Sequence, residues 1–231
     1  MKKIDEKKPA YTAAYNYNPQ AALTVGASLI IMAVAAGIAF GYLHGRLVIP
    51  GNAEATARTI AGNTASFVIE VILWWIIVAT DVAVSIGLFQ LYRDKSPALS
   101  ALAMSTRLVY SLILAAGVII LSTAAGAGAN ALARIDLFEK IWSLGLIIFG
   151  VHLFLLGMAS AKGRSTPSLL SWLLGFAGIC YSAIHLLRNL GTQTAPMASK
   201  LESVLAAPMA LAEMILAVWL IYGFFKSRGN G

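Results

Sequence analysis

Apolar residues along the chain gather in six long runs that are separated by short polar segments. A helix rises about 1.5 Å per residue, so about 20 apolar residues cross the hydrocarbon core of a bilayer. The runs are rich in Ala, Leu, Ile and Gly, and they lack the alternating pattern of barrel strands. The pattern therefore predicts an all-α membrane protein built as a bundle of six transmembrane helices. The predicted spans are about 21–43, 67–91, 99–124, 137–159, 168–190 and 203–225.

Composition supports a lipid environment. Hydrophobic residues make up 59% of the chain and charged residues 12%, against roughly 45–50% and about 25% in soluble domains. The formal charge of +7 comes from Lys and Arg in the short segments between the apolar runs. No soluble segment is long enough to form the basic face that nucleic acid requires. We therefore expect the lipid bilayer as a partner, and no nucleic acid.

The placement of Lys and Arg also predicts orientation, because cytoplasmic loops carry an excess of both. One side of the predicted bundle holds twice as many as the other, so both termini are expected in the cytoplasm of a multi-pass protein of the cytoplasmic membrane. This gives a cytoplasmic lead over 1–20, one transmembrane domain over 21–225 with an outer loop over 44–66, and a cytoplasmic tail over 226–231. The cytoplasmic group is Lys2, Lys3, Lys7, Lys8, Arg93, Lys95, Lys162, Arg164, Lys226 and Arg228, and the outer group is Arg46, Arg58, Arg134, Arg188 and Lys200.

Two helix starts are predicted on the outer side. Asn52 is expected to cap a short helix through Ala53–Ala61, because its side chain can accept from the free amides of a first turn. Asp136 and Glu139 have the spacing of a capping box at the start of the fourth span. The lengths of 44–66 and 124–136 leave open whether these segments re-enter the membrane.

The small residues of the predicted spans indicate how the helices pack and do not indicate a catalytic or binding site. Gly37 and Gly41 form a Gly-x-x-x-Gly motif in the first span, which permits close helix contact within the bundle or in a homo-oligomer. Cys180 is the single cysteine, so the chain has no intrachain disulfide or multi-thiolate metal site.

Ionisable residues inside the spans are the strongest candidates for a site. A lone charge at a helix centre costs about 2.5–3.5 kcal/mol on insertion scales, so such residues usually form pairs or have a function. Asp81, Arg107 and His152 fall at similar depths, and a short loop makes the second and third spans antiparallel neighbours. We therefore expect contact between Asp81 and Arg107, and an interior polar site formed by Asp81, Arg107, His152 and Glu213. A candidate outer polar cluster comprises Arg46, Glu70, Tyr181 and His185.

Cofactor and catalytic motifs are not found. His152 and His185 differ in depth by roughly 15 Å at helical rise, which argues against a shared haem. His44, at the outer end of the first span, is interpreted as a surface side chain. No His-x-x-x-His or Glu-x-x-His pattern indicates a metal site, and no serine near the charges has a histidine placed as its base. We expect no cofactor, no metal and no catalytic residues.

Several segments, which together cover nearly the whole chain, have a familiar pattern: Gly45–Asn52, Asp81–Ala83, Leu91–Arg93, Arg107, Val151–Leu153 to Gly157, Pro167 to Tyr181, and Glu213 to Trp219. These segments resemble the domain of unknown function 4386 family. The family consists of prokaryotic multi-spanning membrane proteins, so the resemblance implies this fold but no activity. It also implies that Arg46, Asp81, Arg107, His152 and Glu213 belong to the family pattern, from which Asn52 and His185 depart.

Three functions are compatible with these residues. The favoured one is an interior polar site for transport of a small solute or protons, or for sensing a small-molecule ligand that the sequence does not identify. The second is a structural or accessory subunit whose buried charges only fix helix packing. The third is a membrane enzyme that acts on lipid or quinone.

Overall fold

A computed structural model describes residues 18–163 and 166–229 of the chain. The predicted N-terminal lead lies almost wholly outside the described residues. The described part is helical and contains no strand. The helices are α1 (Pro19–Ile38), which continues through a π-helical turn (Ala39–His44) into α2 (Gly45–Leu47), then α3 (Ala53–Gly62), α4 (Thr64–Tyr92), α5 (Pro97–Ser122), α6 (Ala131–Gly163), α7 (Ser168–Leu190) and α8 (Ala195–Gly229).

Six of these helical segments are long and apolar enough to cross a membrane, which confirms the predicted six-helix transmembrane fold. Their outward faces remain apolar in the folded chain. Leu112, Leu169 and Trp172 are each more than 70% exposed, an arrangement that water disfavours and lipid tails accommodate.

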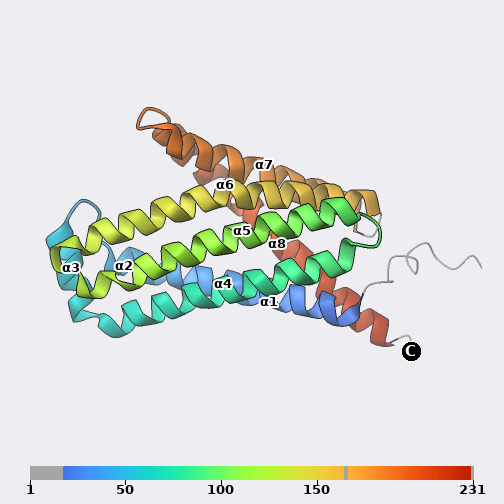
Figure 1. The fold of residues 1–231 in the computed structure, drawn as a ribbon, viewed down its shortest axis with the longest axis horizontal. Helices are drawn as coiled ribbons and strands as arrows, with labels where there is room; N and C mark the ends of the chain where they lie inside the picture. Colours follow the sequence, from blue (N-terminus) through green and yellow to red (C-terminus); the bar gives the residue numbers. More distant parts are fainter. Residues whose placement is uncertain (1–17, 164–165, 230–231) are drawn as a thin grey trace, which may run out of the picture.

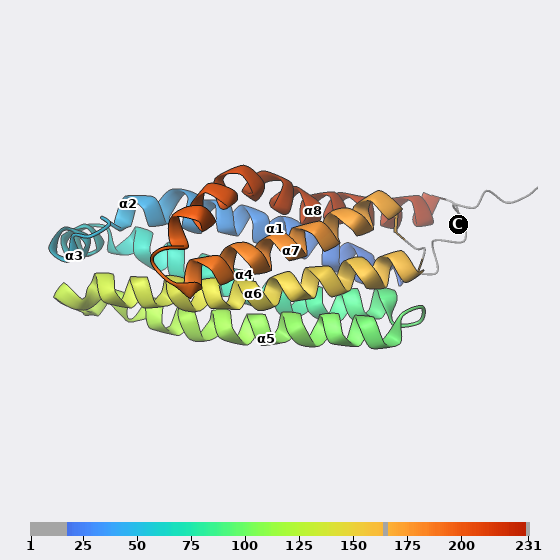
Figure 2. The same cartoon turned by 90° about the horizontal axis from the view of Figure 1, so that it is seen from above.

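The helices form a closed ring. α1 packs against α4 and α8, α5 lies between α4 and α6, and α7 lies between α6 and α8. The loop between α4 and α5 lies at the end of the bundle that holds Pro19 and Arg228, and α3 lies across the opposite end (Figure 1). We call the latter the α3 end. Seen from above, α8 arches over the bundle (Figure 2), and it contains Pro208, whose ring removes one helical hydrogen bond and favours a bend.

Two predicted helix starts have different outcomes. Asn52 does cap α3, and its Oδ1 accepts from the amide of Ala55 at 2.9 Å. The predicted capping box at the fourth span is wrong, because α6 begins at Ala131 and Asp136 therefore lies inside the helix. The helix extends into polar sequence that a hydropathy pattern leaves out.

Small residues let α6 and α7 approach closely. A Cβ added at Gly178 would lie 2.5 Å from the carbonyl oxygen of Gly150, and one at Gly157 would lie 2.7 Å from the amide nitrogen of Gly175. By contrast, a Cβ at Gly37 or at Gly41 would meet nothing within 4 Å. The predicted motif in α1 thus does not pack within the bundle.

Candidate functional site

Arg107 on α5 lies at the centre of a buried polar network inside the ring. Its Nε donates to Oδ1 of Asp81 on α4 at 2.9 Å, and its Nη2 forms an ion pair with the same oxygen at 2.7 Å. Both side chains are fully buried. The predicted contact between Asp81 and Arg107 is therefore confirmed, and it joins the two antiparallel helices in the middle of their length.

His152 on α6 is the second partner of Arg107. Its Nδ1 lies 2.8 Å from the carbonyl oxygen of Ala103, and its Nε2 lies 3.1 Å from Nη1 of Arg107. A carbonyl only accepts and a guanidinium only donates. His152 is consequently neutral, with its proton on Nδ1 and an accepting lone pair on Nε2.

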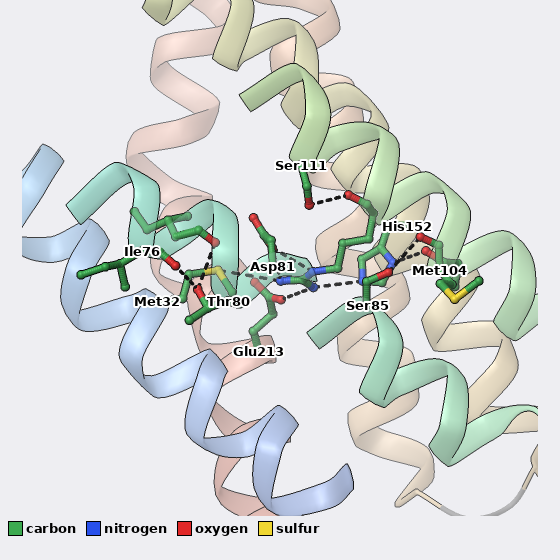
Figure 3. A network of polar contacts seen from close by, with 12 residues as sticks. Met32, Ile76, Thr80, Asp81, Ser85, Met104, Ser111, His152 and Glu213 are labelled. Atoms are coloured by element: carbon green, nitrogen blue, oxygen red, sulfur yellow. Dashed lines mark hydrogen bonds and ion pairs between the residues drawn. The ribbon is translucent and has the colours of Figure 1, made fainter. Parts of the chain in front are cut away.

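Glu213 on α8 completes the network. Its Oε1 accepts from Nη1 of Arg107 at 3.0 Å, and Figure 3 shows Asp81, His152 and Glu213 converging around one guanidinium. Nη2 also points at the sulfur of Met32 on α1, 3.8 Å away. Each of the three guanidinium nitrogens thus has at least one hydrogen-bond partner. The structure brings together the four residues of the predicted interior site.

The charges in this network do not balance. It contains one guanidinium and two carboxyl groups, and a neutral His152 adds nothing. Asp81 engages Arg107 through Oδ1 alone, and its Oδ2 is buried with no hydrogen-bond partner in the described residues. Glu213 contacts Arg107 through Oε1 alone, and its side chain is 18% exposed. Each carboxyl group therefore has one oxygen left over.

Glu213 lies on the wall of a cavity inside the ring, which we call the inner cavity. Its volume is about 390 Å³. All six long helices contribute to its wall, which is mostly aromatic and aliphatic with a few polar groups. The lining includes Met32, Phe40, Trp74, Tyr110, Trp142, Phe149, Tyr181, His185, Glu202, Ala206, Met209, Ala210, Glu213 and Met214.

A second cavity of about 470 Å³ adjoins the inner cavity toward the α3 end, and we call it the vestibule. It lies between α6, α7 and α8 and is more polar, with Asp136, Lys140 and Arg188 in its wall. The two cavities share lining residues, among them Phe40 and Trp142. Phe40 belongs to the π-helical turn of α1, a type of irregularity that occurs often at functional sites. The vestibule thus lies nearer the α3 end, and the inner cavity beside it reaches the carboxyl group of Glu213.

Comparison with known proteins gives the family. The model of a family described as "Domain of unknown function (DUF4386)" matches residues 24–223. The chain belongs to this family. An uncharacterized protein of Archaeoglobus fulgidus is 35% identical over 120 residues, which cover 51% of this chain and 65% of the relative. The matched part thus spans less than two thirds of that relative. No solved structure matches.

In this DUF4386 chain the predicted outer cluster is divided. Arg46 is exposed and contacts the hydroxyl of Tyr42. Tyr181 and His185 stack on each other, with ring centroids 6.3 Å apart, and both line the inner cavity. Glu70 is buried elsewhere, and these four residues do not form one site.

The partner of Glu70 is His44, and the interpretation of His44 as a surface side chain is wrong. His44 is 6% exposed. Its Nδ1 lies 2.6 Å from Oε1 of Glu70, and its Nε2 lies 2.8 Å from Oε1 of Glu139. Sequence reasoning missed this contact. The depth argument that paired Asp81 with Arg107 also places His44 and Glu70 at one level near the α3 end.

The described residues of this DUF4386 protein contain no group of three or more His, Cys, Asp or Glu side chains arranged to hold a metal ion. His152 and His185 each have other partners, the latter through Nδ1 and the hydroxyl of Ser143 at 3.0 Å. The chemistry available at the site is ion pairing and hydrogen bonding around Glu213, within aromatic walls.

Proposed function

We propose that this protein binds a small organic solute inside the membrane, either to transport it or to sense it. One observation carries the proposal: the inner cavity reaches Glu213, a carboxyl group that is paired with the buried Arg107. The volume of about 390 Å³ falls in the range of about 300–1,000 Å³ that is usual for small-molecule sites. Apolar walls with few polar groups are also typical of such sites.

The cavities favour this function over a purely structural one. Protein interiors are packed as densely as organic crystals, and an unfilled cavity is destabilising. Charges that only held helices in register would need the contacts around Arg107 but no adjoining space. Ionisable groups inside membranes also usually mark a pathway or a ligand site.

Access from outside the cell follows from the predicted orientation. The vestibule lies toward the α3 end, because most of its lining residues belong to the start of α6, the end of α7 and the start of α8. Arg46 and Arg58 lie near that end, whereas Arg93 and Lys95 follow α4 at the opposite end together with Lys226 and Arg228 of α8. Counted between the predicted spans of the sequence, the side of Arg93 holds ten Lys and Arg and the side of α3 holds five, and this excess favours the opposite end as cytoplasmic. We therefore propose that the protein resides in the cytoplasmic membrane and that the solute enters from outside.

Filling the cavity tests the proposal. Ala210 lines the inner cavity, whereas Ala207 is exposed on α8 and does not line it. Wild type, Ala210→Trp and Ala207→Trp are extracted with their native lipids, and the small molecules that accompany each protein are identified by mass spectrometry. We expect a small organic molecule with wild type and Ala207→Trp that is lost in Ala210→Trp. Identical extracts from all three proteins would contradict the proposal.

A further inference from the structure

We infer that the inner cavity takes an organic ammonium ion, a cationic nitrogen on an apolar or aromatic body, in exchange for one proton held by Asp81 and Glu213. This inference rests on the proposed function and names the class of solute. Two independent features carry it, which are the charge imbalance around Arg107 and the aromatic wall of the inner cavity.

The charge imbalance requires a positive partner. If both carboxyl groups were ionised, Arg107 would neutralise only one, because His152 accepts from Arg107 and is neutral. One uncompensated negative charge would then remain in the membrane interior, where an unpaired charge is strongly disfavoured. A proton can neutralise it, and so can a cation that reaches Glu213 from the cavity.

Glu213 has a free oxygen for this role. Its Oε1 is engaged by Arg107, and Oε2 has no partner among the described residues. Glu213 lines the inner cavity, whereas Asp81 is fully buried and does not. A cation in the cavity therefore contacts Glu213 and not Asp81. Asp81 takes part in the exchange only through its contact with Arg107.

The wall of the inner cavity suits a cation with an apolar body. Aromatic faces attract ammonium groups, most strongly when water is excluded. An anionic solute finds no comparable partner there, since no described Lys or Arg lines the inner cavity and each nitrogen of the Arg107 guanidinium already contacts a neighbouring side chain. The aromatic residues of the wall are Phe40, Trp74, Tyr110, Trp142, Phe149 and Tyr181.

Each helix around Glu213 contributes a known set of charged or titratable groups. α1 faces it with Met32 and no titratable side chain. The other groups are Asp81 from α4, Arg107 and Tyr110 from α5, His152 from α6, Tyr181 and His185 from α7, and Glu202 from α8 itself. Arg107 is the only one of these that carries a fixed positive charge, so the imbalance remains when they are all counted.

The exchange step is balanced in charge and in atoms. Without solute, one carboxyl group of the Asp81 and Glu213 pair holds a proton. When the ammonium ion enters, the O–H bond breaks and the proton leaves through the vestibule to water at the α3 end. The ammonium ion takes over the charge of that proton, and the network stays neutral. Cation and proton therefore compete for one negative charge.

Three probes of similar size test the inference on the full-length protein in lipid nanodiscs. They are benzyltrimethylammonium, its neutral carbon isostere neopentylbenzene, and the anion benzenesulfonate. Titration calorimetry in two buffers with different ionisation heats counts the protons released. We expect the ammonium ion alone to bind and to release up to one proton. Linkage then requires its affinity to rise by about tenfold per pH unit while the pair is protonated.

Glu213→Gln removes the negative charge, and Glu54→Gln is the same change on the exposed face of α3. Glu213→Gln should abolish proton release and weaken ammonium binding by roughly tenfold to a hundredfold, whereas Glu54→Gln should bind like wild type. The number of protons that the wild-type protein releases on binding the ammonium ion tests the exchange even if neither variant can be purified.

The possible results separate the two proposals. Binding of the neutral isostere as tightly as the ammonium ion, or ammonium binding without proton release, would overturn the exchange but leave a solute-binding protein. Absence of ammonium binding would overturn it as well. If the extracts of wild type and Ala210→Trp were also identical, the proposed function would fail with it.

Discussion

Arg107 contacts Asp81 through two nitrogens, a hydrogen bond from Nε and an ion pair from Nη2, but both reach the same oxygen, Oδ1, and Oδ2 is left buried without a hydrogen bond in the described residues. A bidentate pair would use both oxygens. The single-oxygen contact leaves the remaining nitrogen, Nη1, for His152 and Glu213. The guanidinium of Arg107 on α5 thus connects its own helix to three others, α4, α6 and α8.

Replacing Asp81 should destabilise the bundle. Asp81→Asn removes a buried charged contact of Arg107 and leaves Glu213 as its carboxylate partner, which should cost about 1–3 kcal/mol. Asp94 is 82% exposed beside Arg93, so Asp94→Asn should change the unfolding free energy by less than about 0.5 kcal/mol. Reversible unfolding in mixed detergent and denaturant measures both. An Asp81→Asn protein as stable as wild type would show that the pair does not hold the fold.

The contact of Asp81 with Arg107 could be predicted from sequence because a short loop makes their helices neighbours. For Glu213 and Arg107, the sequence could predict only that they lie at a similar depth in the membrane. It could not predict that they touch, because hydropathy does not encode the order of the helices around the ring. The cavities could not be predicted. They depend on where the π-helical turn of α1 and the bend of α8 lie relative to the other helices, and hydropathy does not encode that arrangement.

His152 should hold its proton on Nδ1. The carbonyl of Ala103 and the guanidinium of Arg107 leave no other neutral arrangement. The chain has three histidines, so nitrogen-15 solid-state NMR of wild type, His44→Gln and His185→Gln assigns the His152 signals by subtraction. We expect a protonated Nδ1 and an unprotonated Nε2. A doubly protonated ring, or a proton on Nε2, would refute the network geometry.

Glu70 and Glu139 share His44 but should differ in their importance. The side chain of Glu70 is 1% exposed and that of Glu139 is 45% exposed. Removing a buried hydrogen-bonded charge costs about 1–3 kcal/mol, and solvent screens an exposed one. Glu70→Gln should therefore lower the unfolding free energy, and Glu139→Gln should change it by less than about 0.5 kcal/mol. The reverse order would contradict the buried position of this contact.

Close packing of α6 on α7 predicts a sharp difference between two glycines one turn apart. A Cβ at Gly178 would lie 2.5 Å from backbone atoms of Gly150 and Phe154, and a Cβ at Gly175 would meet nothing within 4 Å. Gly178→Ala should cost about 1–3 kcal/mol through overpacking. Gly175→Ala should be neutral or stabilising, because alanine favours helix. Equal thermal stability of the two variants would show that the helices are further apart.

Water and solute should reach the carboxyl group of Glu213 from the α3 end, and thiol labelling can measure this access. In a background of Cys180→Ala, which removes the single cysteine, Ala210→Cys places a thiol in the inner cavity and Ala207→Cys places one outside it. With a membrane-impermeant methanethiosulfonate reagent added outside intact cells, we predict rapid labelling of Ala210→Cys and little labelling of Ala207→Cys. Absence of labelling at Ala210→Cys, or equal labelling of the two, would contradict an open path to Glu213.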